Sequence, residues 1–352
     1  MAIRVDDRRR LNSAHNDRVA GVLYATACGD ALGAPYEFKP PVPATTPIVM
    51  HAGGGWELGE WTDDTSMALV IAWAALRGAD LREEAVQDRI VADWVAWTRQ
   101  AKDVGTMTGA VLRDADEPSA AATHEAAQEY HRRTGQSGGN GSLMRTAPVA
   151  LAFLHDPDAL IEAARSISAL THFDPEAGEA CVLWCLAIRH AVLHGEFDLR
   201  GGLGRLPEDR AAVWTARIEE AEANPPTYFT KNGWVVHALQ AAWSAIARTP
   251  VPTNQPARHL QLALEEAVRC GWDTDTVAAI AGGLLGARWG ASAVPLEWQR
   301  VLHGWPLDRD AMTGTTLDTT TLAARRRSSA ADLMGLASLV VSGDDPDGSV
   351  AE

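Results

Sequence analysis

Two acidic stretches organise this chain: Thr62-Asp63-Asp64-Thr65 and, much later, Gly271-Trp272-Asp273-Thr274-Asp275-Thr276. Each leads directly into an apolar segment, residues 67–73 in the first case and 277–283 in the second. A Thr or Asp just before an apolar periodic run marks a helix N-terminus, because its side-chain oxygen accepts hydrogen bonds from the first free backbone N–H groups. The sequence therefore predicts two helices that each begin in an Asp/Thr cluster.

Either cluster alone has a simple interpretation as an acidic helix start. One carboxylate is enough for a cap, however, and adjacent carboxylates repel unless a cation or a proton lies between them. The helix dipole offsets only part of that repulsion. If the two helix starts face each other, four carboxylates and several hydroxyls converge into an oxygen-only site suited to Mg²⁺, Mn²⁺ or Ca²⁺. Four carboxylates carry enough charge for two divalent ions, and no Cys/His spacing indicates zinc.

The composition and net charge of the chain argue against some classes of function. The chain has 352 residues, of which 46% are hydrophobic and 22% charged, with a formal net charge of −15. This charge argues against sequence-independent binding of nucleic acid, which needs a basic surface. A phosphate-bearing ligand would have to be attracted by local features. With no apolar run long enough for a membrane and no apolar signal region, we expect a cytoplasmic protein. The scattered cysteines are expected to be buried free thiols: Cys28, Cys181, Cys185 and Cys270.

The apolar periodicity is close to 3.6 residues along almost the whole chain, and convincing alternating strands are absent. We expect an all-α fold with one compact domain of about a dozen helices over residues 13–341. The Arg-rich arm 1–12 and the acidic tail 342–352 are expected to be disordered. The expected helices cover, approximately, residues 16–28, 83–99, 120–133, 158–170, 176–194, 208–223, 234–248, 257–270 and 320–341, together with those that follow the two acidic clusters.

Three further features are candidates for function, each with a plain structural alternative, and a fourth residue, Asp103, is noted here for its position only. Glu37 follows a helix end between two aromatic residues and is either a solvated loop residue or a functional carboxylate. The stretch Ser137-Gly138-Gly139-Asn140-Gly141 precedes a helix and is either an anion-binding nest of backbone N–H groups or a flexible turn. His172, at a helix junction, either satisfies a helix end or contacts a ligand. Asp103 lies in a short polar segment.

Five segments in this order resemble the ADP-ribosylglycohydrolase family, which includes the dinitrogenase-reductase-activating glycohydrolases and the ADP-ribosylhydrolases. The resemblance spans about residues 18–305. One piece alone is a weak signal, whereas five in order with two separated Asp/Thr clusters are specific. They are Gly29-Asp30-Ala31-Leu32-Gly33-Ala34-Pro35-Tyr36-Glu37, Thr62-Asp63-Asp64-Thr65, Gly139-Asn140-Gly141-Ser142-Leu143-Met144-Arg145, Thr171-His172, and Gly271 to Thr276 with Ala281-Gly282-Gly283.

The resemblance implies a compact orthogonal bundle of helices that holds two Mg²⁺ ions, with Mn²⁺ as a substitute, between the two clusters. By position, one side would supply Thr62, Asp63 and Asp64, and the other Asp273, Asp275 and Thr276. The loop Ser137, Gly138, Gly139, Asn140 and Gly141 would bind the diphosphate of ADP-ribose, with His172 nearby. Asp103 matches a family acidic position beside the distal ribose. Gly139 occupies a position that is often bulkier in relatives.

The implied reaction is cleavage of the glycosidic bond between ADP-ribose and a modified side chain, most simply arginine. Such cleavage passes through an oxocarbenium-like state and usually uses two carboxylates. We expect Glu37 to act as a metal-side or general acid/base residue and Asp103 to orient the substrate, and the opposite assignment stays open. The expected partners are an ADP-ribosylated protein and ADP-ribose, with the chain itself a monomer.

Other functions remain open from the sequence. A non-catalytic ADP-ribose sensor would use the same ligand site, although intact metal residues argue against it. Hydrolysis of a serine-linked, nucleic-acid-linked or free ADP-ribose derivative would use the same chemistry on another acceptor. A metal-dependent phosphoesterase acting on nucleotides is a third possibility, which release of phosphate rather than ADP-ribose would identify.

Overall fold

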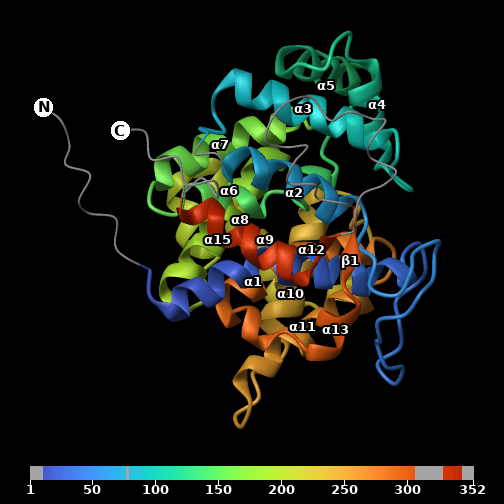
Figure 1. Cartoon of the computed structure of the whole chain (residues 1–352), viewed down its shortest axis with the longest axis vertical. Helices are drawn as coiled ribbons and strands as arrows, with labels where there is room; N and C mark the ends of the chain where they lie inside the picture. The colour runs from blue at the N-terminus through green and yellow to red at the C-terminus, as the bar shows by residue number, and fades with distance from the viewer. Residues whose placement is uncertain (1–10, 77–78, 306–327, 343–352) are drawn as a thin grey trace, which may run out of the picture.

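Two helices from opposite ends of the chain form the centre of the fold. They are α1 (Ser13–Gly33) and α12 (Thr274–Trp289), which lie side by side in this computed structural model of residues 11–76, 79–305 and 328–342 (Figure 1). In α1 every residue from Gly21 to Gly33 is buried, and in α12 every residue from Thr274 to Ala287. A helix that is buried on all sides needs small or apolar residues all round, as both sequences provide.

Glycines let the backbones of α1 and α12 touch. A Cβ placed on Gly29 would lie 2.1 Å from the carbonyl oxygen of Ala278, and one on Gly282 would lie 2.1 Å from that of Ala25. Only glycine permits so close an approach. The contact continues to the C-terminal end of α1, where a Cβ on Gly33 would lie 2.4 Å from the Cα of Asp275. The end of one helix is thereby held against the start of the other, and both ends carry carboxylates.

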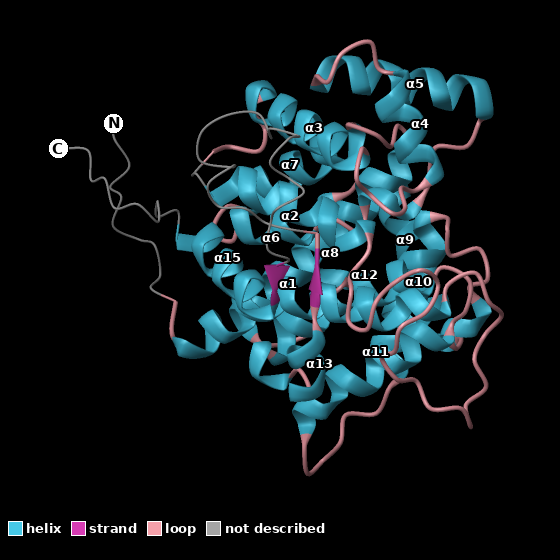
Figure 2. Ribbon diagram, turned by 45° about the vertical axis from the view of Figure 1, so that its right-hand side comes forward, coloured by secondary structure: helices cyan, strands magenta, loops and turns pink. Residues whose placement is uncertain are grey.

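The remaining helices surround this pair, as Figure 2 shows, and confirm the prediction of an all-α fold. Helices α3, α4 and α5 lie at one end of the molecule and α11 and α13 at the other (Figure 1). The bounds are α2 (Asp63–Leu76), α3 (Glu84–Thr98), α4 (Thr106–Asp114), α5 (Ala120–Thr134), α6 (Ala147–Ala152), α7 (Pro157–Ala169), α8 (Pro175–His194), α9 (Glu208–Ala223), α10 (Val235–Arg248), α11 (His259–Arg269), α13 (Leu296–Val301) and α15 (Ala330–Ser342).

Short 3₁₀ turns connect several helices. They are η1 (Ala34–Tyr36), η2 (Asn140–Ser142), η3 (Arg200–Arg205), η4 (Pro226–Tyr228), η5 (Pro256–Arg258) and η6 (Ala291–Ala293). Two-residue strands β1 (His303–Gly304) and β2 (Ser328–Ser329) pair antiparallel, with His303 opposite Ser329. Strands of two residues are too short to produce an alternating pattern, which explains why the sequence did not predict them.

The helix boundaries differ from the predictions in two informative places. Helix α1 continues past Cys28 to Gly33, because Gly29 and Gly33 serve close packing rather than termination. Helix α4 was not predicted, because it buries only Thr108, Val111 and Leu112 and so has little apolar periodicity. Residues 1–10 of the predicted disordered arm, nearly all of the predicted disordered tail, and the start of the predicted 320–341 helix lie outside the described residues.

The buried side chains form one continuous apolar cluster that includes residues of α1, α2, α8, α10 and α12. All four cysteines are buried free thiols, as predicted. None of the helices that the structure describes is both long enough and apolar enough to cross a membrane.

Candidate active site

The start of α2 is capped from another helix. Asp30 of α1 accepts hydrogen bonds through Oδ1 from the backbone N–H of Thr62 (2.8 Å) and through Oδ2 from the N–H and hydroxyl of Thr65 (3.0 and 2.6 Å). The first turn of α2 therefore does not need the carboxylates of Asp63 and Asp64 as caps. This excludes the simple interpretation of that cluster as an acidic helix start.

At the start of α12, too, the carboxylate at the N-cap position does not cap the helix. Asp273 stands at the N-cap position but its side chain makes no capping hydrogen bond. Its Oδ2 instead accepts a hydrogen bond from the side-chain amide of Asn140 (2.7 Å), which belongs to the glycine loop. Both acidic clusters thus contribute carboxylates that the local helix geometry does not use.

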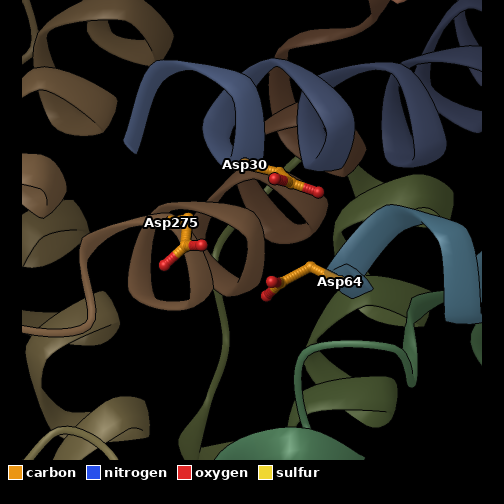
Figure 3. Close-up of side chains that lie close together, drawn as sticks. All are labelled: Asp30, Asp64 and Asp275. Carbon is orange, nitrogen blue, oxygen red and sulfur yellow. The ribbon is translucent and has the colours of Figure 1, made fainter. Parts of the chain in front are cut away.

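These carboxylates converge in two groups that share one member. Oxygens of Asp30, Asp64 and Asp275 all lie within 4.8 Å of one another, and so do oxygens of Glu37, Asp273 and Asp275. Figure 3 shows the first group, with the three carboxylates pointing into one space from α1, α2 and α12. The predicted meeting of the two clusters at Asp64, Asp273 and Asp275 agrees with this geometry. Asp30 was missed as a site residue, although a lone Asp in the apolar run of residues 19–34 was a usable signal.

Burial and mutual repulsion raise the pKa values of these carboxyl groups and so favour their protonated forms. Burial raises the pKa of Asp30 to about 6. The pKa of Glu37 is raised to about 8, mainly by burial and also by the negative charge of Asp273. The pKa of Asp63 is raised to about 7, mainly by burial and also by the negative charge of Asp103. The pKa values of Asp64 and Asp275 lie well above the ordinary range, mainly because both are buried. In the described part of the chain no Lys or Arg forms an ion pair with any of these carboxylates.

The donor set fits hard divalent cations. Oxygen ligands with high negative charge and no thiolate or imidazole are the ligands that Mg²⁺, Mn²⁺ and Ca²⁺ prefer. Asp64 Oδ1 is buried and has no hydrogen-bond partner in the described structure, which is costly for a polar atom unless a ligand satisfies it. Two groups of three carboxylates that share Asp275 have the arrangement that a pair of ions would need.

The other predicted metal residues lie beside these groups. Asp63 belongs to neither group, and its Oδ2 accepts a hydrogen bond from the backbone N–H of Gly105 (3.1 Å). The hydroxyl of Thr62 donates to Asp64 Oδ2 (3.1 Å). Thr276 is buried, and its backbone N–H donates to Asp275 Oδ1 (2.9 Å). These three residues therefore orient or border the carboxylates that the geometry brings together.

Asp103 belongs to neither carboxylate group. Its side chain is exposed, and it lines a cavity of roughly 240 Å³ whose wall also includes Asp63, Trp56 and Trp61. Lys102, which pairs with Glu60 (2.6 Å), also lines the cavity. The cavity reaches from the surface to Asp63, so it offers space beside the carboxylate groups for part of a substrate.

The glycine loop is held in place from both sides. The carbonyl of Gly138 accepts from Val235 N–H (2.9 Å) at the start of α10, and Asn140 N–H donates to Gly233 O (3.1 Å). The Ser137 hydroxyl lies 2.7 Å from Nδ1 of His131. Within the described residues the N–H groups of Gly138 and Gly139 donate to no protein acceptor, which agrees with a preformed anion nest.

His172 is buried against this loop. A Cβ on Gly141 would lie 3.2 Å from its Nε2, and one on Gly139 would lie 3.5 Å away. Burial and the charge of Arg145 hold the pKa of His172 well below its ordinary value, so its ring is neutral. The structure thus places His172 against the predicted loop, and Asn140 of that loop donates a hydrogen bond to Asp273.

This helical bundle, with carboxylates from both ends of the chain beside a glycine loop, agrees with the expected family. The profile of the ADP-ribosylglycohydrolase family matches residues 11–332. The chain belongs to this family, whose members hydrolyse glycosyl bonds.

Several named relatives and a solved structure are similar to it. The ADP-ribosylarginine hydrolase Tri1 of Pseudomonas putida (strain GB-1) is 30% identical over 80% of this chain and 73% of its own length. The ADP-ribosyl-[dinitrogen reductase] glycohydrolase of Rhodospirillum rubrum is 27% identical over 80% and 89%, and human ADP-ribosylhydrolase ARH3 is 26% identical over 82% and 90%. A solved structure titled ADP-ribosylglycohydrolase-related protein complex superposes with a TM-score of 0.66 and 26% identity, covering 94% of this chain and 99% of that one.

Proposed function

We propose that this protein is a divalent-metal-dependent hydrolase that releases ADP-ribose from a modified protein side chain, with arginine as the acceptor and Mg²⁺ as the metal. The observation that supports it most is the pair of carboxylate groups that share Asp275 and that form no ion pair with a Lys or Arg of the described residues. Arginine is chosen because two of the relatives named above are called an ADP-ribosylarginine hydrolase and a dinitrogen reductase glycohydrolase.

Five residues would hold the metal ions: Asp30, Asp64 and Asp275 in one group, and Glu37, Asp273 and the shared Asp275 in the other, with Thr62 orienting Asp64. Bound Mg²⁺ or Mn²⁺ would supply charge stabilisation and an activated water. Glu37 is only partly buried and lies just outside the C-terminal end of η1, where a substrate atom can reach it. Its position favours a role in proton transfer to or from the reacting group.

The rest of the site would divide the substrate between two subsites. The glycine loop, with free N–H groups at Gly138 and Gly139, is suited to the diphosphate. The cavity beside Asp63 and Asp103 lies next to the carboxylate groups and is suited to the distal ribose and the start of the acceptor side chain. The substrate is thus expected to be an ADP-ribosylated protein of the cytoplasm, where four free thiols stay reduced.

The test is release of labelled ADP-ribose from an ADP-ribosyl-arginine substrate with Mg²⁺ and, in parallel, with EDTA. We expect release that requires the metal and that Mn²⁺ supports. ADP-ribosyl-serine and an ADP-ribosylated nucleic acid are assayed beside it to identify the acceptor. Binding of ADP-ribose without release from any substrate would show a sensor instead, and release of inorganic phosphate from nucleotides would show a phosphoesterase.

A further inference from the structure

Arg145 is a buried cation that forms no ion pair with a carboxylate of the described residues. Its side chain is fully buried, and its guanidinium carbon lies 4.0 Å from the centre of the Trp94 ring. Nη2 donates to the hydroxyl of Thr171 (2.7 Å), Nη1 faces the sulfur of Met67 (3.7 Å), and Nε has no partner in the described structure. Burying a charge without a counter-ion costs several kcal/mol. Such a residue needs an explanation beyond packing.

The hydrogen bond from Arg145 determines the direction in which the Thr171 hydroxyl donates its own proton. Arginine can only donate, so the Thr171 oxygen is the acceptor of that bond. The single proton of the Thr171 hydroxyl remains available, and among the described residues the acceptor within its reach is Nδ1 of His172 (2.7 Å). His172 is neutral, and a neutral imidazole carries one proton. Because Nδ1 accepts, that proton is on Nε2.

The Nε2 edge of His172 faces the glycine loop. Cβ atoms placed on Gly139 and Gly141 would lie 3.5 and 3.2 Å from Nε2, so the absence of side chains there lets the loop backbone approach this edge of the ring. No described residue accepts a hydrogen bond from Nε2. The unpaired N–H groups of Gly138 and Gly139 lie in the same loop. The loop and the ring edge beside it thus carry three N–H donors that have no protein acceptor among the described residues.

We propose that Arg145 and Thr171 are positioning residues that fix His172 as an Nε2–H donor for the anionic group bound by the loop of residues 138–141. Taking that group as the diphosphate of ADP-ribose rests on the proposed function. The charge of Arg145 also acts on His172, which lies against the loop, in a chain whose net charge is −15. A local positive charge of this kind favours a phosphate at a protein whose overall field repels it.

The tautomer is tested first, on the ligand-free protein. Long-range ¹H–¹⁵N correlation spectra of protein labelled at histidine nitrogens distinguish a protonated from an unprotonated ring nitrogen. The signals of His172 are assigned by their loss in His172→Gln. We expect an unprotonated Nδ1 and a protonated Nε2 in the wild type. In Thr171→Val, which keeps the side-chain shape and removes the hydroxyl, we expect this preference to be lost.

Affinity for ADP-ribose is tested second, by titration calorimetry. Thr171→Val should weaken binding about tenfold, the size expected for a misdirected hydrogen bond to a charged group. Arg145→Met should weaken ADP-ribose binding at least as much. If the Arg145→Met variant does not fold, the test relies on Thr171→Val alone. Thr123→Val in α5 is the matched control, because its buried hydroxyl bonds only to Ser119 and Ala120 carbonyls, and it should leave affinity unchanged.

A double-mutant cycle separates positioning from a general structural effect. The amide of Gln in His172→Gln offers an N–H near the position of Nε2 without needing the Thr171 hydroxyl. In that background Thr171→Val should change affinity less than twofold. The same tenfold loss in that background, or a protonated Nδ1 in the wild type, would overturn the proposal. If the wild type does not bind ADP-ribose, the proposed function fails, and the tautomer spectra still decide the role of Arg145 and Thr171.

Discussion

Replacing Gly29 with Ala tests the claim that glycine contacts between α1 and α12 build the site. The added Cβ would lie 2.1 Å from the carbonyl oxygen of Ala278 and 2.5 Å from its carbonyl carbon, both rigid backbone atoms. The helices must therefore separate by roughly 1 Å next to Asp30. Overpacking of this kind costs about 3 kcal/mol, and better helix propensity returns about 1 kcal/mol, so the net loss is about 2 kcal/mol. For a chain of this length that lowers Tm by about 3 °C.

The control is the same substitution where space is open. Nothing lies within 4 Å of a Cβ on Gly335 in α15, so Gly335→Ala should raise Tm by about 1 °C. Differential scanning calorimetry in EDTA measures both variants. Titration with Mn²⁺ then measures the effect on the carboxylate group of Asp30, Asp64 and Asp275, which should bind more weakly in Gly29→Ala. A Tm for Gly29→Ala equal to or above the wild type, with unchanged Mn²⁺ affinity, would refute the role of the close helix contact.

Three further predictions concern the site. Glu37→Gln should reduce kcat at least a hundredfold while changing ADP-ribose affinity less than threefold, and a loss confined to affinity would exclude its part in proton transfer. Gly139→Asp should weaken ADP-ribose binding at least tenfold by repulsion of the diphosphate, whereas the neutral control Gly139→Asn should weaken it less; equal effects would show that charge is not the cause. In EDTA the free energy of unfolding should fall as the pH rises from about 4 to about 8. The pKa values of Asp30, Asp63 and Glu37 are raised in the folded state, so between these pH values the folded protein binds more protons than the unfolded protein. Saturating Mg²⁺ should remove this trend, and a Tm that rises between pH 5 and 8 in EDTA would contradict it.

Much of the fold was accessible from the sequence because long helices leave a strong periodic signal. The boundaries expected for residues 208–223 agree with α9 (Glu208–Ala223), whose periodic run is bounded by Pro207 and Asn224. Glycine was the main source of error. In isolation, Gly29 and Gly33 resemble a helix stop, and only the packing of α12 against them shows that they permit close contact. Such a contact joins residues about 250 apart in sequence, which local patterns cannot report.

Part of the site could also be predicted from the sequence, because some of its residues lie in a recognisable local pattern. Asp64, Asp273 and Asp275 lie in clusters whose charge exceeds what helix capping needs, so the sequence alone marked them. Asp30 stands alone in an apolar helix, and its function depends on which helix start it faces, a property of the tertiary structure. The unpaired charge of Arg145 could not be predicted either, because an arginine in a sequence gives no sign that its surroundings lack a carboxylate.

The number of bound metal ions tests the central claim most directly: that two carboxylate groups sharing Asp275 hold two divalent cations. Purified protein is stripped with EDTA, loaded with Mn²⁺ and measured by metal analysis and calorimetric titration, together with Asp64→Asn, Asp273→Asn and Asp275→Asn. The account predicts two ions in the wild type, one in each of Asp64→Asn and Asp273→Asn, and none in Asp275→Asn, with helical content unchanged. A wild type that binds no Mn²⁺, or an Asp275→Asn variant that keeps both ions, would contradict it.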